Sequence, residues 1–497
     1  MRSTAWACLL GVLIAGNVHA AEESPLDEEA LAAAAELRDD ALEGTRAWDI
    51  VRSLTTEVGP RLAGSAGDRA AVAWALRSLR ELGFENVRAE NVEVPRWERG
   101  TIEVRITEPF PQPMIATALG GSIGTPEEGL EAPVLQVADI AELEALSRSQ
   151  VAGKIVFFNK RMRRSRDGAD YSEVVKARTD GAAAAARLGA VGVAIRSAGT
   201  SIARVAHTGT TKYAPGERRI PAIALSNADA DLLQAQLETG QRVDVHMKLT
   251  ARQLPATRSA NVIAEVPAAT DDAGIVVLAA HLDSWDLGTG AIDDGAGVAI
   301  VIEAARRIAE ADRPLRRTLR IILAANEEFG LSGARAYAAS RETGRVGRHV
   351  VGLEADFGAG KVWRLESRVA EEARPLVEAM HAVLAPLGIE LGGNEAHGGA
   401  DLSPLRKLGM PVLGLTQDGS RYFDYHHSAS DTLDKVSRAN LDQCVAAYAA
   451  TAYLAAVAAG DFGQLEPEPE TATETETPGP DDTGESDTEG SDPVRFR

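Results

Sequence analysis

A pattern typical of a buried strand, in residues 275–280, leads straight into a group of polar residues. The run is uninterruptedly apolar and rich in β-branched side chains, as expected of a strand that is covered on both faces. His281 follows at once, Asp283 comes two residues later, and Asp293 and Asp294 lie among glycines. A hydrophobic core does not require this order of residues. The stretch therefore predicts a strand that delivers metal ligands into a crevice.

Further strands and helices alternate along the rest of this half of the chain. Strand patterns occur at 319–325, 350–354 and 411–416, and helical patterns occur at 297–309, 333–340, 371–387 and 440–459. Strongly apolar strands that alternate with helices favour a largely parallel sheet covered by helices on both faces.

A second pattern of elements is predicted nearer the N-terminus, where short strands and an alanine-rich helix suggest a small α/β module inserted into a larger domain. A chain of 497 residues is long enough for such an arrangement. We therefore divide the chain into a signal peptide (1–20), an acidic N-terminal helix (21–45), a main domain in two parts (46–125 and 257–462), an inserted module (126–256) and a disordered acidic tail (463–497).

The first twenty residues have the pattern of a secretory signal. Arg2 precedes an apolar run over 5–16, and the small residues Val18 and Ala20 suit cleavage after about Ala20. The run is too short to span a bilayer by itself, although a buried N-terminal helix is an alternative. We expect an exported protein, periplasmic or extracellular. Cys444 would be its only cysteine, so no intramolecular disulfide is expected.

The charge of the chain limits its partners. The formal net charge is -21, which argues against nucleic acid and against an anionic membrane surface. Part of the excess lies in the tail, whose Glu, Pro, Thr and Gly content cannot bury enough apolar surface to order it.

Acidic residues and a histidine follow several of the predicted strands. His281 and Asp283 follow the first, Glu327 and Glu328 follow the strand at 319–325, and Asp356 follows the strand at 350–354. In an open parallel sheet, ligands bind outside the carboxyl ends of the strands. These side chains are therefore expected at one edge. A further candidate, His427, lies in the sequence Tyr-His-His-Ser-Ala-Ser-Asp-Thr at 425–432.

Imidazoles and carboxylates without cysteine suit Zn²⁺ or a similar divalent ion. Two histidines and several acids exceed the ligands of one tetrahedral zinc, so we predict a metal pair bridged by one carboxylate. Glu327 and Glu328 would then divide between a ligand and a general base. Each residue alone has a structural explanation, but their occurrence at successive strand ends favours the metal site. The motifs of zincin, serine-hydrolase and phosphate-loop enzymes are absent from the sequence.

These residues fall into four motifs: His281-x-Asp283, Gly290-Ala291-x-Asp293-Asp294-Gly295, Glu327-Glu328-x-Gly330-Leu331 and His427-Ser428-x-x-Asp431-Thr432. The set resembles the co-catalytic di-zinc aminopeptidase family from about residue 48 to 459. The segments 58–62, 94–100 and 281–286 are similar to its carboxypeptidase Q branch in particular. The resemblance implies a mostly parallel mixed sheet with helices on both faces, an α/β/α sandwich, and an inserted module similar to a protease-associated domain.

The resemblance also implies two Zn²⁺ per chain. Asp293 would bridge the two ions, His281 and Asp356 would complete one site, and Glu328 and His427 the other. A homodimer is a further implication.

Roles for the remaining residues follow from the same resemblance. Glu327 would be the general base, and Asp283 would fix the tautomer of His281. Many relatives have a tyrosine, assigned to oxyanion stabilisation, where this chain has His426, so that role passes to His426.

The resulting hypothesis is an exported zinc metallo-exopeptidase that acts on dipeptides or short peptides with a free terminus. Two alternatives are a single-zinc, glutaminyl cyclase-like aminoacyltransferase and a non-catalytic receptor or binding protein on the same fold. The number of metal ions per chain would distinguish the aminoacyltransferase from the exopeptidase. A non-catalytic binding protein would be expected to have lost metal ligands or the general base.

Overall fold

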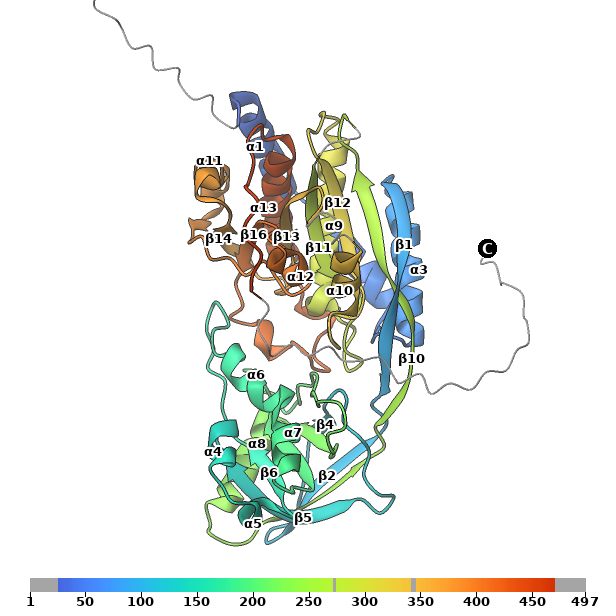
Figure 1. Ribbon diagram of the computed structural model, residues 1–497, viewed down its shortest axis with the longest axis vertical. Coiled ribbons are helices and arrows are strands. Elements are labelled where there is room, and N and C mark those ends of the chain that lie inside the picture. Colours follow the sequence, from blue (N-terminus) through green and yellow to red (C-terminus); the bar gives the residue numbers. More distant parts are fainter. Residues whose placement is uncertain (1–25, 271–273, 341–345, 470–497) are drawn as a thin grey trace, which may run out of the picture.

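The computed structural model describes residues 26–270, 274–340 and 346–469. The expected signal peptide and the tail beyond residue 469 lie outside these residues. The described chain forms two eight-stranded sheets, which occupy opposite ends of an elongated molecule (Figure 1).

The first sheet is mixed, with a parallel centre. Its order is β1-β10-β12-β11-β13-β16-β14-β15. Strands β12, β11, β13 and β16 are parallel neighbours, whereas β1, β10 and β14 add antiparallel pairs. The strands are β1 (Glu85–Glu98), β10 (Arg252–Val266), β11 (Ile275–His281), β12 (Thr318–Ala324), β13 (His349–Glu354), β14 (Val362–Arg368), β15 (Glu390–Leu391) and β16 (Val412–Gln417).

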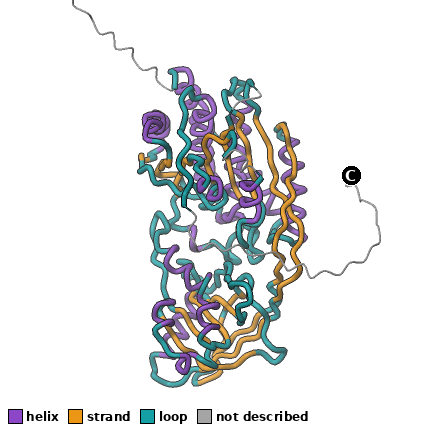
Figure 2. Tube along the Cα trace, viewed as in Figure 1, coloured by secondary structure: helices purple, strands orange, loops and turns teal. Residues whose placement is uncertain are grey.

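Helices cover both faces of this sheet, because alternate residues of its central strand point to opposite sides. Val276, Leu278 and Ala280 of β11 pack in one core with α1 (Glu28–Leu42), α2 (Ala47–Ser53), α3 (Ala66–Glu81), α9 (Ala296–Glu310), α11 (Arg374–Leu384) and α13 (Arg438–Val457). Val277 and Ala279 pack in a second core with α10 (Ser332–Ala339) and α12 (Ser403–Lys407). The predicted α/β/α architecture is confirmed, and Figure 2 shows the helices flanking the strands.

The second sheet has the order β3-β2-β9-β5-β6-β7-β8-β4. Its strands are β2 (Ile102–Glu108), β3 (Gln112–Met114), β4 (Ala116–Ala118), β5 (Leu130–Val137), β6 (Ile155–Phe158), β7 (Gly192–Arg196), β8 (Ala222–Leu225) and β9 (Asp244–Leu249). Helices α4 (Ile140–Glu144), α5 (Arg148–Val151), α6 (Tyr171–Thr179), α7 (Gly181–Arg187) and α8 (Asn227–Leu237) accompany them. We call residues 102–249 the second-sheet module; the division of the chain into domains stays a proposal.

The antiparallel pair β1 and β10 leads from the first sheet to the second-sheet module (Figure 1). Neither strand shows hydrophobic alternation over its full length. In β1, Pro95 falls at a register shift between Val94 and Arg96, which interrupts the alternation. The first half of β10 is largely exposed and polar, so it has no apolar pattern.

Among the described residues, no helix has both the length and the apolar character needed to cross a membrane.

Candidate metal centre

Three neighbouring parallel strands bring the predicted residues to one edge of the first sheet. His281 is the last residue of β11, and Asp283 follows it. Glu327 and Glu328 follow β12, while Asp356 follows β13. Since β12, β11 and β13 run in the same direction, their carboxyl ends lie side by side.

Asp293 lies between two histidines that come from distant parts of the chain. It lies in the short turn η2 (Ala291–Gly295), just before α9, at a kink where the backbone is not helical. Its Oδ1 is 3.2 Å from His281 Nε2, and its Oδ2 is 3.3 Å from His427 Nε2. On the outer sides, His281 Nε2 is 3.5 Å from Asp356 Oδ1, and His427 Nε2 is 2.8 Å from Glu328 Oε2. Two sets of nitrogen and oxygen atoms therefore share one carboxylate.

The chemistry of this cluster fits divalent cations. Asp293 Oδ2 and Glu328 Oε1 are enclosed and make no hydrogen bond within the described chain. Carboxylate oxygens are rarely buried in this way without a hydrogen-bond donor or a cation. Burial lowers the pKa of His427, which keeps that imidazole neutral. Burial also raises the pKa of Glu328 well above its usual range, so a cation beside it would be needed to hold it as a carboxylate. A neutral imidazole and a carboxylate are the donors that Zn²⁺ takes.

Two aspartates of the opening motif support the first histidine. Asp294 accepts hydrogen bonds from the main-chain N–H of His281 (3.2 Å) and of Gly297 (3.1 Å). Asp283 contacts the His281 ring mainly through its main-chain oxygen, 3.1 Å from Nδ1, while its carboxylate Oδ1 is 3.7 Å from the same nitrogen. The same Oδ1 accepts a hydrogen bond from Glu327 N at 3.0 Å, so Asp283 touches both residues.

Glu327 and His426 complete the cluster. The Glu327 side chain is half-buried, and burial raises its pKa to about 8. The ring of His426 stacks on that of His427 with centroids 3.5 Å apart, and its Nε2 is 3.6 Å from Asp293 Oδ2. Burial lowers the pKa of His426 to about 3, so this ring is also neutral. The structure thus places each predicted site residue in one group.

Asp431 supports the centre in a way that the sequence analysis did not identify. Its carboxylate accepts hydrogen bonds from the main-chain N–H groups of Ala291 (2.8 Å), Ile292 (2.6 Å) and Asp293 (3.2 Å). Burial raises its pKa to about 7. The sequence did contain an indication of this role, because Asp431 belongs to the same motif as His427.

Arg61 is a second support from outside the predicted set. Its side chain is fully buried and donates to the main-chain oxygens of Leu282 (2.6 Å), Thr289 (2.7 Å) and Gly290 (2.8 Å). It therefore joins the segment after β11 to the turn that carries Asp293. In the sequence, Arg61 belongs to the segment 58–62, which resembles the carboxypeptidase Q branch but does not itself indicate this supporting role.

The second-sheet module reaches the two histidines at 426 and 427. His207 Nδ1 is 2.7 Å from the main-chain oxygen of His426, and Thr208 N donates to the main-chain oxygen of His427 at 2.8 Å. The ring of Tyr171 lies edge-on to His426, with centroids 5.2 Å apart. No spacing pattern in the sequence indicates these contacts, because the partners are more than two hundred positions apart.

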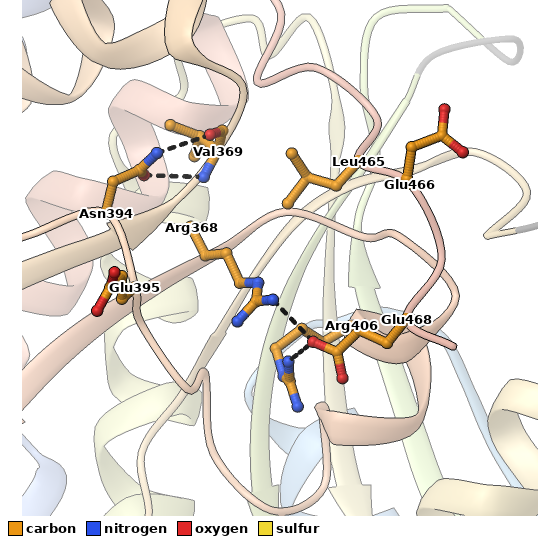
Figure 3. Close-up of a pocket in the computed structure, with 8 residues that line it drawn as sticks. All are labelled: Arg368, Val369, Asn394, Glu395, Arg406, Leu465, Glu466 and Glu468. Carbon is orange, nitrogen blue, oxygen red and sulfur yellow. Dashed lines mark hydrogen bonds and ion pairs between the residues drawn. The ribbon is translucent and has the colours of Figure 1, made fainter. Parts of the chain in front are cut away.

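A cavity of about 610 Å³ lies elsewhere, beside the C-terminal segment (Figure 3). In it, Glu468 forms ion pairs with Arg368, at 2.8 Å, and with Arg406. None of the residues that line it belongs to the metal cluster.

The fold and the cluster define a metallopeptidase, and similarity to known proteins agrees. Residues 261–452 match the family described as Peptidase family M28. Carboxypeptidase Q from Rattus norvegicus is 34% identical over 411 residues, which are 83% of this chain and 85% of that protein. The chain therefore belongs to peptidase family M28.

Solved structures show the same architecture. The crystal structure of a peptidase M28 precursor from Shewanella amazonensis matches with a TM-score of 0.86 and 46% identity, covering 90% of this chain and 100% of that one. A zinc aminopeptidase from Bacillus subtilis shares the fold, with a TM-score of 0.61 and 21% identity over 85% of this chain and 97% of its own.

Proposed function

We propose that this family M28 metallopeptidase is an exported zinc exopeptidase that hydrolyses dipeptides or short peptides with a free terminus. One observation carries the proposal: the two oxygens of Asp293 face His281 and His427 respectively. A carboxylate placed in this way suits a bridge between two cations.

In this proposal each chain holds two Zn²⁺. Asp293 would be shared between the two sites, His281 and Asp356 would complete one, and Glu328 and His427 would complete the other. When bound, the ions supply Lewis-acid polarisation of the scissile carbonyl and lower the pKa of a water.

The protein's own residues would then move protons and hold charge. Glu327 takes a proton from the attacking water and returns it to the leaving amine. Its elevated pKa, about 8, suits a group that must both accept and donate near neutral pH. Asp283 holds the His281 ring, and a neutral His426 donates a hydrogen bond to the developing oxyanion.

The alternatives explain the cluster less well. A single-zinc aminoacyltransferase needs neither the second histidine nor a shared carboxylate. A non-catalytic binding protein has no need for the half-buried Glu327 beside the cluster. The remaining expectations also stay proposals: cleavage after about residue 20, export, the inserted domain and a homodimer.

The proposal is tested with purified mature protein and unblocked dipeptides. We expect release of free amino acids, loss of that release after chelation, and recovery when Zn²⁺ is added. Doubly blocked dipeptides serve as the control and should resist hydrolysis. Failure to release amino acids at saturating Zn²⁺ would contradict the proposal.

A further inference from the structure

Arg178 is a buried cation directly behind one of the proposed ligands. It lies on α6 of the second-sheet module, and the residue is 8% exposed. Its Nη1 is 2.7 Å from the hydroxyl of Tyr171 and 3.3 Å from His427 Nδ1. Its Nε is enclosed and makes no hydrogen bond, and no carboxylate of the described chain forms an ion pair with it.

Other buried arginines of this protein have full sets of acceptors. Arg61 donates to three main-chain oxygens, whereas the following three form ion pairs. Arg99 forms an ion pair with Asp286, Arg196 pairs with Asp231 at 2.8 Å, and Arg306 pairs with Glu303 at 2.7 Å. A buried guanidinium that has neither an anionic partner nor several oxygen acceptors is unfavourable unless a ligand supplies the partner. Arg178 is therefore a candidate ligand-binding group.

Metal binding would leave Arg178 with still fewer partners. If His427 binds zinc through Nε2, its Nδ1 carries the proton and can donate to the main-chain oxygen of Thr208, 3.3 Å away. That nitrogen then cannot accept a hydrogen bond from Arg178. This step rests on the proposed function, because it requires His427 to be a ligand.

The guanidinium is held in a slot that fixes its position. A Cβ at Gly209 would lie 2.4 Å from Arg178 Cζ and Nη1 and 2.5 Å from Nε, so the group packs directly on the main chain of that glycine. The ring of Tyr171 also lies near the guanidinium, with its centroid 5.5 Å from Arg178 Cζ. A charged group that is already held in place binds its partner at a lower entropic cost.

We propose that Arg178 binds the free carboxylate of the C-terminal residue of a dipeptide substrate. A guanidinium is suited to bidentate contact with a carboxylate. Arg178 lies beside Nδ1 of the His427 ring, whereas Nε2 of the same ring faces Asp293 and Glu328. One residue spans at most about 3.6 Å, so the carboxylate within reach belongs to the residue directly after the scissile bond. A longer peptide would present an uncharged peptide group there, so Arg178 selects dipeptides.

The test compares an unblocked dipeptide with the same dipeptide amidated at its C-terminus. The wild-type protein should prefer the free acid by about 100-fold in kcat/KM, the scale of a charge-assisted pair buried in a site. In Arg178→Gln this preference should disappear, mainly through a higher KM for the acid. The rate of hydrolysis of the amidated dipeptide should change by less than about threefold in this variant, because that substrate has no C-terminal carboxylate for Arg178 to bind.

Control variants separate binding from folding. Lys176→Gln, exposed on the same helix, should behave as wild type. Arg178→Lys should retain part of the preference for the free acid, since lysine keeps the positive charge but cannot bind a carboxylate bidentately as a guanidinium does. If Arg178→Gln does not fold, Tyr171→Phe removes the hydroxyl contact alone and should raise KM for the acid only. Zinc content and melting temperature are measured for each variant.

Two results would overturn the inference. One is a wild-type protein that cleaves acid and amide equally well. The other is an Arg178→Gln variant that loses zinc and loses both activities in parallel, which would make Arg178 a positioning residue for His427. Neither result touches the proposed exopeptidase activity. Failure of the wild type on both substrates at saturating Zn²⁺ would reject that activity and the inference with it.

Discussion

The carboxylate of Asp431 accepts a hydrogen bond from the main-chain N–H of Asp293, at 3.2 Å. The same carboxylate also accepts from the two preceding N–H groups, at 2.6 and 2.8 Å. The position of the shared carboxylate in the metal cluster is therefore set by a residue far along the chain. Loss of Asp431 would leave three buried donors without a partner.

We predict that Asp431→Ala weakens zinc binding by about 10- to 100-fold, as expected for groups that orient metal ligands. Stability should also fall, by roughly 3 kcal/mol or more, because each unsatisfied buried donor costs about 1–3 kcal/mol. Zinc titration and chemical denaturation measure the two effects. Asp434→Ala, in an exposed ion pair with Lys435, is the matched control and should change neither. Normal zinc affinity in Asp431→Ala would show that the turn at Ala291–Gly295 keeps its conformation without the Asp431 carboxylate.

The adjacent Glu327 and Glu328 should respond differently to the same isosteric change. We predict that Glu327→Gln loses about 10²- to 10⁴-fold in kcat and retains its zinc, because a general base acts on protons and not on the metal. Glu328→Gln should instead lose zinc at the site of His427, whose Nε2 is 2.8 Å from Glu328 Oε2. Zinc content is measured on each variant beside kcat. A fully active Glu327→Gln would remove this residue from its role as base.

The metal content of single-ligand variants tests the shared carboxylate. The wild type should bind two Zn²⁺ per chain. His281→Ala and His427→Ala should each bind about one tightly, and Asp293→Ala should weaken both sites, since its oxygens face both histidines. Elemental analysis after dialysis gives the counts. One zinc in the wild type would favour the aminoacyltransferase alternative.

The central strands and the residues at their ends could be predicted because both follow from local patterns. An apolar run such as β11 identifies a buried strand, and parallel neighbours must bring their carboxyl ends together. The supports of the site could not be derived in this way. Arg61 acts through main-chain oxygens of other segments, and any side chain can have such an acceptor nearby. Arg178 reaches His427 only because the second-sheet module folds back on the first sheet.

The long pair β1 and β10 shows a second limit. Hydrophobic alternation identifies a strand only where one face is buried. Residues at the start of β10 are exposed, and hydrogen bonds to β1 hold them without such a pattern. Tertiary pairing therefore determined elements that the sequence pattern did not indicate.

Asp68 should make the stability of the fold depend on pH. The residue is 3% exposed and accepts hydrogen bonds from Ser259 Oγ (2.7 Å) and Gly64 N (2.8 Å). Burial nevertheless raises its pKa from 3.8 to about 6. The folded state therefore holds this proton more tightly than the unfolded state does. The contribution of the protonated group to stability is complete below pH 4 and is lost as the pH rises through about 6.

We predict that Asp68→Asn removes this loss, because a neutral amide can accept from Gly64 N and donate to Ser259 Oγ. Each pKa unit is worth about 1.4 kcal/mol, so the variant should gain up to roughly 3 kcal/mol over wild type between pH 4 and pH 7. Denaturation of both proteins in chelator, at several pH values, gives the difference between them and cancels the titration of all other groups. A difference that stays constant from pH 4 to pH 7 would show that Asp68 ionises normally in the folded protein.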